Sequence, residues 1–269
     1  QAVSDLGLGM VLSTLSTTDG ETVRRQAQNQ PLWFQLYVHR DRGLTRELIQ
    51  RAEASGFDAL CVTVDAPLLG RRERDESNRF SLPPHMSLPL LGDASSAAVG
   101  SNEGSGLFEY FLTQIDPSLT WKDLEWMAGI TKLPIIPKGI LHEDDARIAA
   151  QMNLPALVVS NHGGRQLDTA PATIDVLPEI VAAAKAETPD IEIYVDGGIR
   201  RGTDIMKAIA LGAQAVLVGR PVLWGLGVDG AAGAREVLRI LRDEFDLAMA
   251  LSGCTSVGDI TEDMVKRNT

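Results

Sequence analysis

Cysteine is scarce in this sequence, which contains only Cys61 and Cys254. Cys61 lies inside an apolar run, and Cys254 follows a segment with helical periodicity. We therefore expect both thiols to be reduced core residues, a pattern that fits a reducing compartment. The fold is not expected to depend on a disulfide, because a chain of 269 residues is long enough to bury a sizeable core.

Basic residues are also in deficit, with 25 Lys and Arg against 36 Asp and Glu and a formal net charge of -11. This balance argues against a nucleic-acid partner, which needs a basic surface. It does not exclude an anionic substrate, because a few arginines in a cleft set the local field. No run of about 18 apolar residues occurs, so no membrane span is expected. Neither a signal peptide nor a peroxisomal address is recognised, and a cytoplasmic protein is predicted.

Short apolar runs alternate with amphipathic stretches along the chain. The expected strands are Gly9–Leu12, Trp33–Leu36, Ala59–Val64, Leu133–Ile136, Ala156–Val159, Ile191–Val195 and Ala215–Val218, and the helices include Gly43–Ala54, Glu143–Gln151, Thr173–Ala186 and Thr203–Ala210. Near-continuous apolar strands are typical of parallel sheets that are buried on both faces. The pattern predicts an α/β fold of the TIM (β/α)8-barrel type, with seven of its eight strands visible. A doubly wound open sheet is the alternative.

The arrangement between these elements indicates one barrel domain over residues 1–269. Gln1–Leu8 resembles the tail of a helix whose preceding strand is not present, so the domain is expected to be incomplete at its N-terminus. A long connection over residues 78–120 is expected to include a poorly ordered lid near Asp93–Gly106, which has few apolar residues. The amphipathic stretch Ala232–Leu251 is the expected last helix.

Polar residues follow the predicted strands. They are Ser13 and Thr14, Gln35 and Tyr37, Thr63 and Asp65, Lys138, Ser160 and His162, Asp196, and Gly219 with Arg220. In a parallel barrel the carboxyl ends of the strands meet at one mouth, where active sites are found. A single polar residue at such a position is usually a local cap. Because all seven predicted strands are followed by polar residues, a polar binding site at the mouth of the barrel is expected.

The segment Ser160–Asp168 reads Ser-Asn-His-Gly-Gly-Arg-Gln-Leu-Asp. It places the imidazole of His162 and the guanidinium of Arg165 three residues apart on a glycine-rich turn. An arginine binds a carboxylate bidentately, and a histidine removes a neighbouring proton. The pair therefore suits proton abstraction beside a bound carboxylate.

This segment resembles the active-site signature of the FMN-dependent 2-hydroxy-acid oxidases and dehydrogenases. The resemblance extends through Trp33–Tyr37, Thr63–Pro67 with Gly70–Asp75, Pro137–Gly139, Val195–Asp204 and Leu217–Pro221. It implies oxidation of an (S)-2-hydroxy acid, lactate or possibly glycolate, to the 2-oxo acid, with hydride transfer to flavin N5. Reoxidation by O2 would give hydrogen peroxide, and a homotetramer is expected. Two alternatives remain: a dehydrogenase that uses a haem or quinone acceptor, and an inert truncated barrel that serves as a binding or assembly module.

The resemblance also implies roles for individual residues. His162 would be the base, and Asp65 would stabilise its imidazolium form. Arg165 and Tyr37 would hold the substrate, with Arg72 nearby, and Lys138 would sit by flavin N1 and the C2 carbonyl. The expected cofactor-binding residues are Ser13, Gln35, Thr63, Lys138, Ser160, Asp196, Gly198, Arg200, Gly219 and Arg220. The last four would hold the phosphate, which barrels often bind after their last two strands.

Leu15 lies two residues after the strand-end Ser13, at a place that is typically tryptophan in glycolate-oxidising relatives. The smaller leucine favours lactate, unless Leu15 merely packs under the lid. The spacing Gly225-Leu226-Gly227-Val228-Asp229-Gly230 matches a dinucleotide-binding loop, but no strand directly precedes it, and a loop before the last helix is expected. His39, His85 and His142 show no metal-ligand spacing and are expected on the surface or in loops.

Overall fold

The computed structural model describes residues 1–27, 29–83, 85–92 and 106–266. The chain divides into two compact units, one formed by Gly9–Ile136 and the other by Gln1–Leu8 together with Pro137–Thr269. Most of the expected lid falls outside the described residues.

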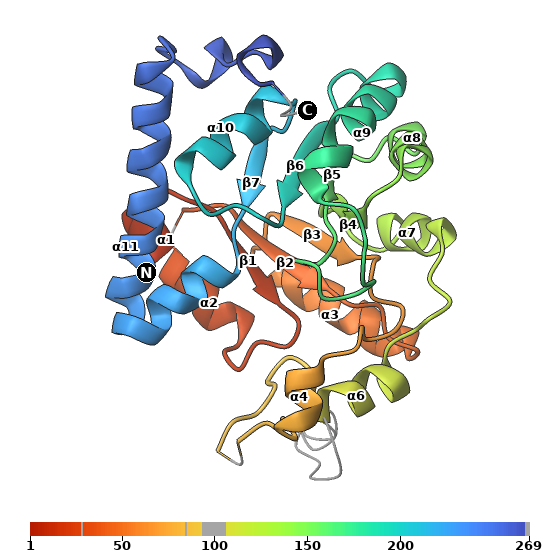
Figure 1. The fold of residues 1–269 in the computed structure, drawn as a ribbon. Helices are drawn as coiled ribbons and strands as arrows, with labels where there is room; N and C mark the ends of the chain where they lie inside the picture. The colour runs from red at the N-terminus through yellow and green to blue at the C-terminus, as the bar shows by residue number, and fades with distance from the viewer. Residues whose placement is uncertain (28, 84, 93–105, 267–269) are drawn as a thin grey trace. The chain divides into compact units, whose positions relative to one another are not determined.

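The unit Gly9–Ile136 alternates strands and helices (Figure 1). Its elements are β1 (Met10–Ser13), α2 (Gly20–Ala27), β2 (Leu32–Leu36), α3 (Arg42–Ala54), β3 (Ala59–Thr63), α4 (Glu73–Ser77), α6 (Gly106–Gln114), α7 (Trp121–Ala128) and the start of β4 (Ile135–Ile140). β1, β2 and β3 pair in parallel, and Ser13 lies opposite Gln35. Every residue of β3 is buried, as expected for an apolar strand covered on both faces.

The second unit continues the same alternation. It holds α1 (Ala2–Asp5), the rest of β4, α8 (Glu143–Gln151), β5 (Ala156–Val159), α9 (Thr173–Glu187), β6 (Glu192–Asp196), α10 (Gly202–Ala210), β7 (Ala215–Leu217), α11 (Arg220–Leu251), and the 3-10 turns Val257–Asp259 and Glu262–Met264. β4, β5, β6 and β7 pair in parallel. Within this unit α10 packs beside α11 (Figure 1).

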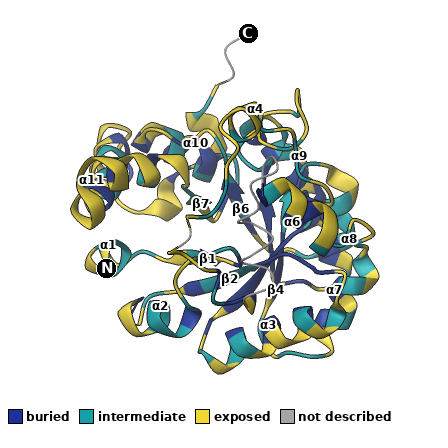
Figure 2. Cartoon of the chain, turned by 90° about the horizontal axis from the view of Figure 1, so that it is seen from below, coloured by how far each residue is buried: buried dark blue, intermediate teal, exposed yellow. Residues whose placement is uncertain are grey.

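The seven strands follow one another in sequence order, β1 to β7, in a parallel sheet. A doubly wound sheet reverses its strand order at a switch point, and this order contains no reversal. β3 and β5 are buried along their whole length, the end strands β1 and β7 are partly exposed, and the helices expose their outer sides (Figure 2). The prediction of a β/α-barrel type of fold with seven strands is therefore confirmed.

The structure differs from the sequence-based expectation at two elements. β4 runs over Ile135–Ile140 rather than Leu133–Ile136, so Lys138 lies within the strand and not after it. The glycine-rich stretch at Gly225–Gly230 is not a loop, because α11 begins at Arg220 and runs through it. A kink at Asp229 and Gly230, where φ and ψ leave the helical region, separates this first part from the expected helix Ala232–Leu251.

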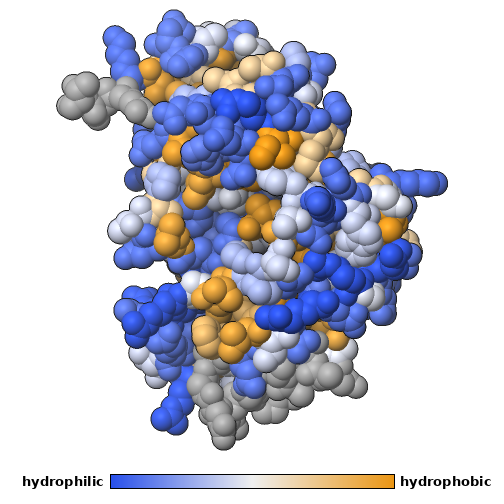
Figure 3. Space-filling view, turned by 90° about the vertical axis from the view of Figure 1, so that its right-hand side faces the viewer, coloured by the Kyte–Doolittle hydropathy of each residue, from blue (hydrophilic) through white to orange (hydrophobic). Residues whose placement is uncertain are grey.

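The surface agrees with the acidic composition. The face in Figure 3 is mainly hydrophilic, with hydrophobic residues in small groups. No helix in the described ranges combines the length and the apolar character that crossing a bilayer demands. Both cysteines are buried and neither forms a disulfide, as expected.

Candidate active site

Polar side chains at the ends of β1, β2 and β3 form one hydrogen-bonded line. Gln35 Nε2 donates to Thr63 Oγ1 at 2.9 Å, and Gln35 Oε1 accepts from the backbone N–H of Thr14 at 3.2 Å. Since both ends of the amide have partners, its orientation is fixed. Ser13 Oγ accepts from the backbone N–H of Leu15 at 3.1 Å, which holds the half-buried Leu15 just beyond the strand. The structure thus brings Ser13, Gln35 and Thr63 together.

An aromatic group lies beside the line. The Tyr37 ring meets the Phe111 ring edge-on, with centroids 5.0 Å apart, and Phe111 meets Tyr110 in the same way at 6.0 Å. His39 Nε2 and the Tyr110 hydroxyl are 2.6 Å apart and hydrogen-bonded. His39 lies in the loop between β2 and α3, which is one of the two positions expected for it, but it is 1% exposed and so is not a surface residue. Burial lowers its pKa to about 4, despite opposing effects of the Tyr37 backbone and Asp41.

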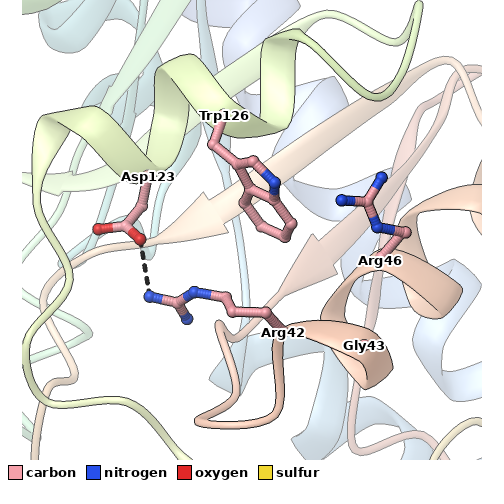
Figure 4. A pocket seen from close by; sticks show the side chains of 5 residues that line it. All are labelled: Arg42, Gly43, Arg46, Asp123 and Trp126. Carbon is pink, nitrogen blue, oxygen red and sulfur yellow. Dashed lines mark hydrogen bonds and ion pairs between the residues drawn. The ribbon is translucent and has the colours of Figure 1, made fainter.

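The first residue of α3, Arg42, ties that helix to Asp123 in α7 (Figure 4). Arg42 Nη2 lies 2.6 Å from Asp116 Oδ2 and 2.7 Å from Asp123 Oδ1. The guanidinium carbons of Arg42 and Arg46 lie 5.9 and 5.6 Å from the centre of the Trp126 ring. These side chains and Gly43 line a cavity of about 280 Å³. Because two carboxylates already neutralise Arg42, this feature is a structural clamp.

Asp65 and Arg72 follow β3 and are half-buried. Arg72 immediately precedes α4 as its N-cap residue, but its side chain forms no capping hydrogen bond. Their proposed contacts with His162 and with substrate involve the other unit, and these remain predictions.

The second unit gathers a charged group at the ends of β4, β5 and β6. Lys138 Nζ lies 3.1 Å from Asp196 Oδ2 and donates to Ser160 Oγ at 2.9 Å. The Lys138 and Asp196 side chains are 14% and 16% exposed, so water screens their attraction only weakly. Asp196 Oδ1 is buried and, within the described part of the chain, accepts no hydrogen bond. A buried carboxylate oxygen of this kind is suited to accept a donor from a ligand.

His162 stands on a strained turn after β5. It has φ +57°, which is uncommon for a residue with a side chain, and Gly163 and Gly164 continue at +67° and +72°. Hydrogen bonds hold the turn, among them His162 N–H to Ser160 Oγ at 3.1 Å, Gly164 N–H to Asn161 Oδ1 at 3.1 Å, and Arg220 Nη2 to the Gly163 carbonyl at 2.6 Å. Such strain is typical of positions where a side chain has a functional role.

Arg165 follows the turn and is exposed, two residues before the exposed Leu167. Its proposed contact with the substrate carboxylate stays a prediction. Arg165 follows His162 by three residues and comes directly after Gly163 and Gly164, whose positive φ angles bend the chain.

The predicted phosphate residues lie at the starts of two helices. Gly219 is the N-cap of α11 and Arg220 its first residue, while Gly198 and Arg200 precede α10. Gly198 has φ +78°, and an added Cβ at Gly198 or Gly219 would meet no atom within 4 Å. Helix starts with exposed backbone and arginines bind anions. The Arg200 guanidinium carbon lies 5.1 Å from the centre of the Trp224 ring.

Sequence reasoning overlooked several residues that hold these groups. Thr173 donates from Oγ1 to the Asp196 carbonyl at 2.6 Å, and Asn161 donates to the Pro171 carbonyl at 3.1 Å. Tyr110 is buried against His39. Asn161 lies inside the signature segment, which was a usable signal. Thr173 and Tyr110 contact Asp196 and His39, which are distant from them in the sequence, so no local pattern indicated their roles.

Comparison with known proteins places this geometry in a family. A family model described as FMN-dependent dehydrogenase matches residues 1–267. The chain belongs to this family. The expectation of FMN as cofactor is thereby confirmed. Asp196 Oδ1 and the open glycines before α10 and α11 fit such a group, since its ring and phosphate need hydrogen-bond donors, acceptors and close backbone approach.

Relatives and solved structures agree with the family. The chain is 54% identical over 263 residues to "L-lactate oxidase" of Nostoc sp. (strain PCC 7120 / SAG 25.82 / UTEX 2576), covering 96% of this chain and 71% of that protein. It is 49% identical over 265 residues to "Glycolate oxidase 3" of Oryza sativa subsp. japonica, covering 98% and 71%. A crystal structure of mandelate oxidase with (S)-4-hydroxymandelic acid matches with a TM-score of 0.90 and 41% identity, covering 97% of this chain and 72% of that chain.

Proposed function

We propose that this protein oxidises an (S)-2-hydroxy acid, with lactate as the preferred substrate, to the corresponding 2-oxo acid. The observation that carries the proposal is the strained turn that fixes His162 in the same unit as Lys138 and Asp196. The similarity to relatives named for lactate and glycolate oxidation supports the substrate class. FMN, when bound, supplies the two-electron acceptor for the hydrogen of the substrate α-carbon.

The residues of the chain would divide the remaining work. The α-hydrogen leaves with its electron pair, the hydroxyl proton passes to the His162 imidazole, and the carbon–oxygen single bond becomes a carbonyl. Asp65 would stabilise the imidazolium that results. Arg165 would hold the substrate carboxylate by its two-pronged guanidinium, and Tyr37 and Arg72 would complete this binding set.

The charged pair in the second unit would hold the cofactor ring. Lys138, fixed by Asp196 and Ser160, would place a positive charge beside the N1–C2 edge. Gln35, Thr63 and Ser13 would bond the ring and its ribityl chain. Gly198, Arg200, Gly219 and Arg220 would hold the phosphate.

A visible spectrum before and after anaerobic addition of lactate tests the proposal. We expect flavin bands that bleach with lactate, and we expect His162→Gln to slow the bleaching by roughly 100-fold or more, as for the loss of a general base. Unchanged bleaching in this variant would contradict the role of His162. Absence of flavin bands would favour the inert module.

We also propose O2 as the final electron acceptor, with hydrogen peroxide as the second product. This distinguishes an oxidase from a dehydrogenase with a haem or quinone acceptor. One peroxide per 2-oxo acid in air supports the oxidase, whereas turnover only with an added acceptor excludes it. A cytoplasmic location and a homotetramer complete the proposal, and cell fractionation and light scattering of the purified protein test them.

A further inference from the structure

The side chain of Tyr37 lies in a closely packed setting that the proposed reaction does not by itself require. Tyr37 is 8% exposed, and its neighbours Tyr110 and His39 are 0% and 1% exposed. The ring of Tyr37 packs edge-on against Phe111, and Phe111 packs edge-on against Tyr110. The orientation of the Tyr37 ring therefore depends on where α6, which carries Phe111, is held.

A hydrogen bond between two buried side chains links α6 to the loop that carries Tyr37, in addition to the main-chain bonds described below. His39 Nε2 and the Tyr110 hydroxyl are 2.6 Å apart, and their rings meet edge-on with centroids 6.1 Å apart. His39 is in turn fixed by its backbone N–H, which donates at 3.0 Å to the buried Thr45 Oγ1 in α3. His39 therefore connects α3 with α6, because its backbone bonds to Thr45 in α3 and its imidazole bonds to Tyr110 in α6.

The same loop is fastened at its outer end. The Arg40 N–H donates to the Gln114 carbonyl at 2.8 Å, and the Asp116 N–H donates to the Val38 carbonyl at 2.9 Å. Arg42 forms ion pairs with Asp116 and with Asp123, the second of which Figure 4 shows. These bonds already secure the main chain between β2 and α3. The His39–Tyr110 bond is thus not needed to hold the loop as a whole, and it acts on the side-chain layer that surrounds Tyr37.

The ionisation of the two partners suits a permanent contact. Burial lowers the pKa of His39 and raises the pKa of Tyr110 above its ordinary value. The charge interaction with Tyr37 raises the pKa of Tyr110 further. Both partners therefore stay neutral at physiological pH, and the bond between them persists.

We propose that His39 and Tyr110 form a positioning pair that holds the aromatic layer of α6 against Tyr37 and so fixes the Tyr37 hydroxyl for binding the substrate carboxylate. This inference rests on the substrate-binding role proposed for Tyr37. The pair touches neither substrate nor cofactor in this account, and it acts through the packing of Phe111 on Tyr37.

Tyr110→Phe in the FMN-loaded protein is the first test, because it removes only the hydroxyl and leaves the ring. The probe is pyruvate, a 2-oxo acid product, titrated against the flavin absorption band. We expect the dissociation constant of pyruvate to rise roughly 3- to 10-fold, the worth of one neutral hydrogen bond, with FMN affinity unchanged. Tyr194→Phe is the matched control, because this remaining tyrosine lies in β6 and its hydroxyl donates to Glu192.

The double variant Tyr37→Phe, Tyr110→Phe decides whether the pair acts through Tyr37. We expect it to bind pyruvate no more weakly than Tyr37→Phe alone, because the hydroxyl that the pair positions is gone. Additive effects would overturn the proposal, as would an unchanged pyruvate affinity in Tyr110→Phe.

The position of His39 gives an independent check. His39→Leu is expected to match Tyr110→Phe, and His39→Gln, which retains a hydrogen-bonding side chain, is expected to recover part of the pyruvate affinity. Equal losses in the two His39 variants would contradict a positioning role. If Tyr37→Phe by itself leaves the pyruvate affinity unchanged, the result contradicts the binding role proposed for Tyr37, and the positioning role of the pair falls with it.

Discussion

The backbones of Gly225 and Gly233 approach closely within α11, and a substitution there tests how firmly the first part of this helix, which carries Arg220, is held. Gly225 and Gly233 are buried on either side of the kink, and a Cβ added to Gly233 would fall well inside contact distance of the Gly225 carbonyl. Relieving a clash with backbone costs about 3 kcal/mol, the upper end for overpacking. Alanine regains about 1 kcal/mol of helix preference over glycine. Gly233→Ala should therefore lower the free energy of unfolding by about 2 kcal/mol.

Differential scanning calorimetry and FMN titration measure the two consequences. The melting temperature of Gly233→Ala should fall by about 4–8 °C, given about 2–4 °C per kcal/mol in a chain of this size. FMN should also bind more weakly, because the first part of α11 carries Arg220, whose Nη2 contacts the Gly163 carbonyl. Gly227→Ala is the matched control: Gly227 is exposed in the same helix with no atom near its Cβ position. That variant should melt about 2–4 °C higher, as a gain of about 1 kcal/mol predicts. Equal melting temperatures for the two variants would refute the reasoning.

Three other changes test separate parts of the structure. Because the pKa of His39 is about 4 in the fold and 6.5 ordinarily, its stabilising contribution is complete above pH 6.5. It should decline by up to about 3 kcal/mol as the pH falls towards 4, a loss visible in urea unfolding and absent from His39→Leu. Lys138→Met should lower the free energy of unfolding by about 3 kcal/mol by leaving the Asp196 carboxylate unpaired, and adding Asp196→Asn should restore most of it. The parent should prefer lactate over glycolate by about 4- to 200-fold in kcat/KM, and Leu15→Trp should shift that ratio towards glycolate; an unshifted ratio would remove the support for an apolar niche.

The strands were the most predictable part of the fold. β3 and β5 are buried along their whole length, and their apolar runs announce this directly. β4 was predicted less well, because its second half contains Pro137, Lys138 and Gly139, which are uncommon residues in a buried strand. The register of β4 against β5 shifts between Lys138 and Ile140, and a shift of this kind depends on the neighbouring strand rather than on local sequence.

The errors at α11 and His39 have a common physical origin. Gly225, Gly227 and Gly230 lower helix preference locally, so a loop was expected, yet packing of Gly225 against Gly233 holds the first part of α11 in place. A histidine in a polar sequence context was expected at the surface or in a loop. His39 does lie in a loop, yet it is buried there, because Tyr110, 71 residues away, gives it a hydrogen-bond partner. In both cases the deciding partner lies outside the local sequence.

A protein with an acidic composition can bind the anionic ligands of the proposed function, because charges act strongly only over short distances in salt solution. Charges separated by more than about 8 Å at physiological ionic strength are largely screened. Acidic side chains beyond that distance act weakly on the proposed site, which has cations of its own: Arg220 at the start of α11, Arg200 before α10, and Lys138 beside Ser160. Asp196 neutralises part of the Lys138 charge, but it also fixes the Nζ atom 3.1 Å away. A cation held in place in a poorly screened setting serves anion binding better than a mobile one, because no ordering of the side chain remains to be done when the ligand arrives.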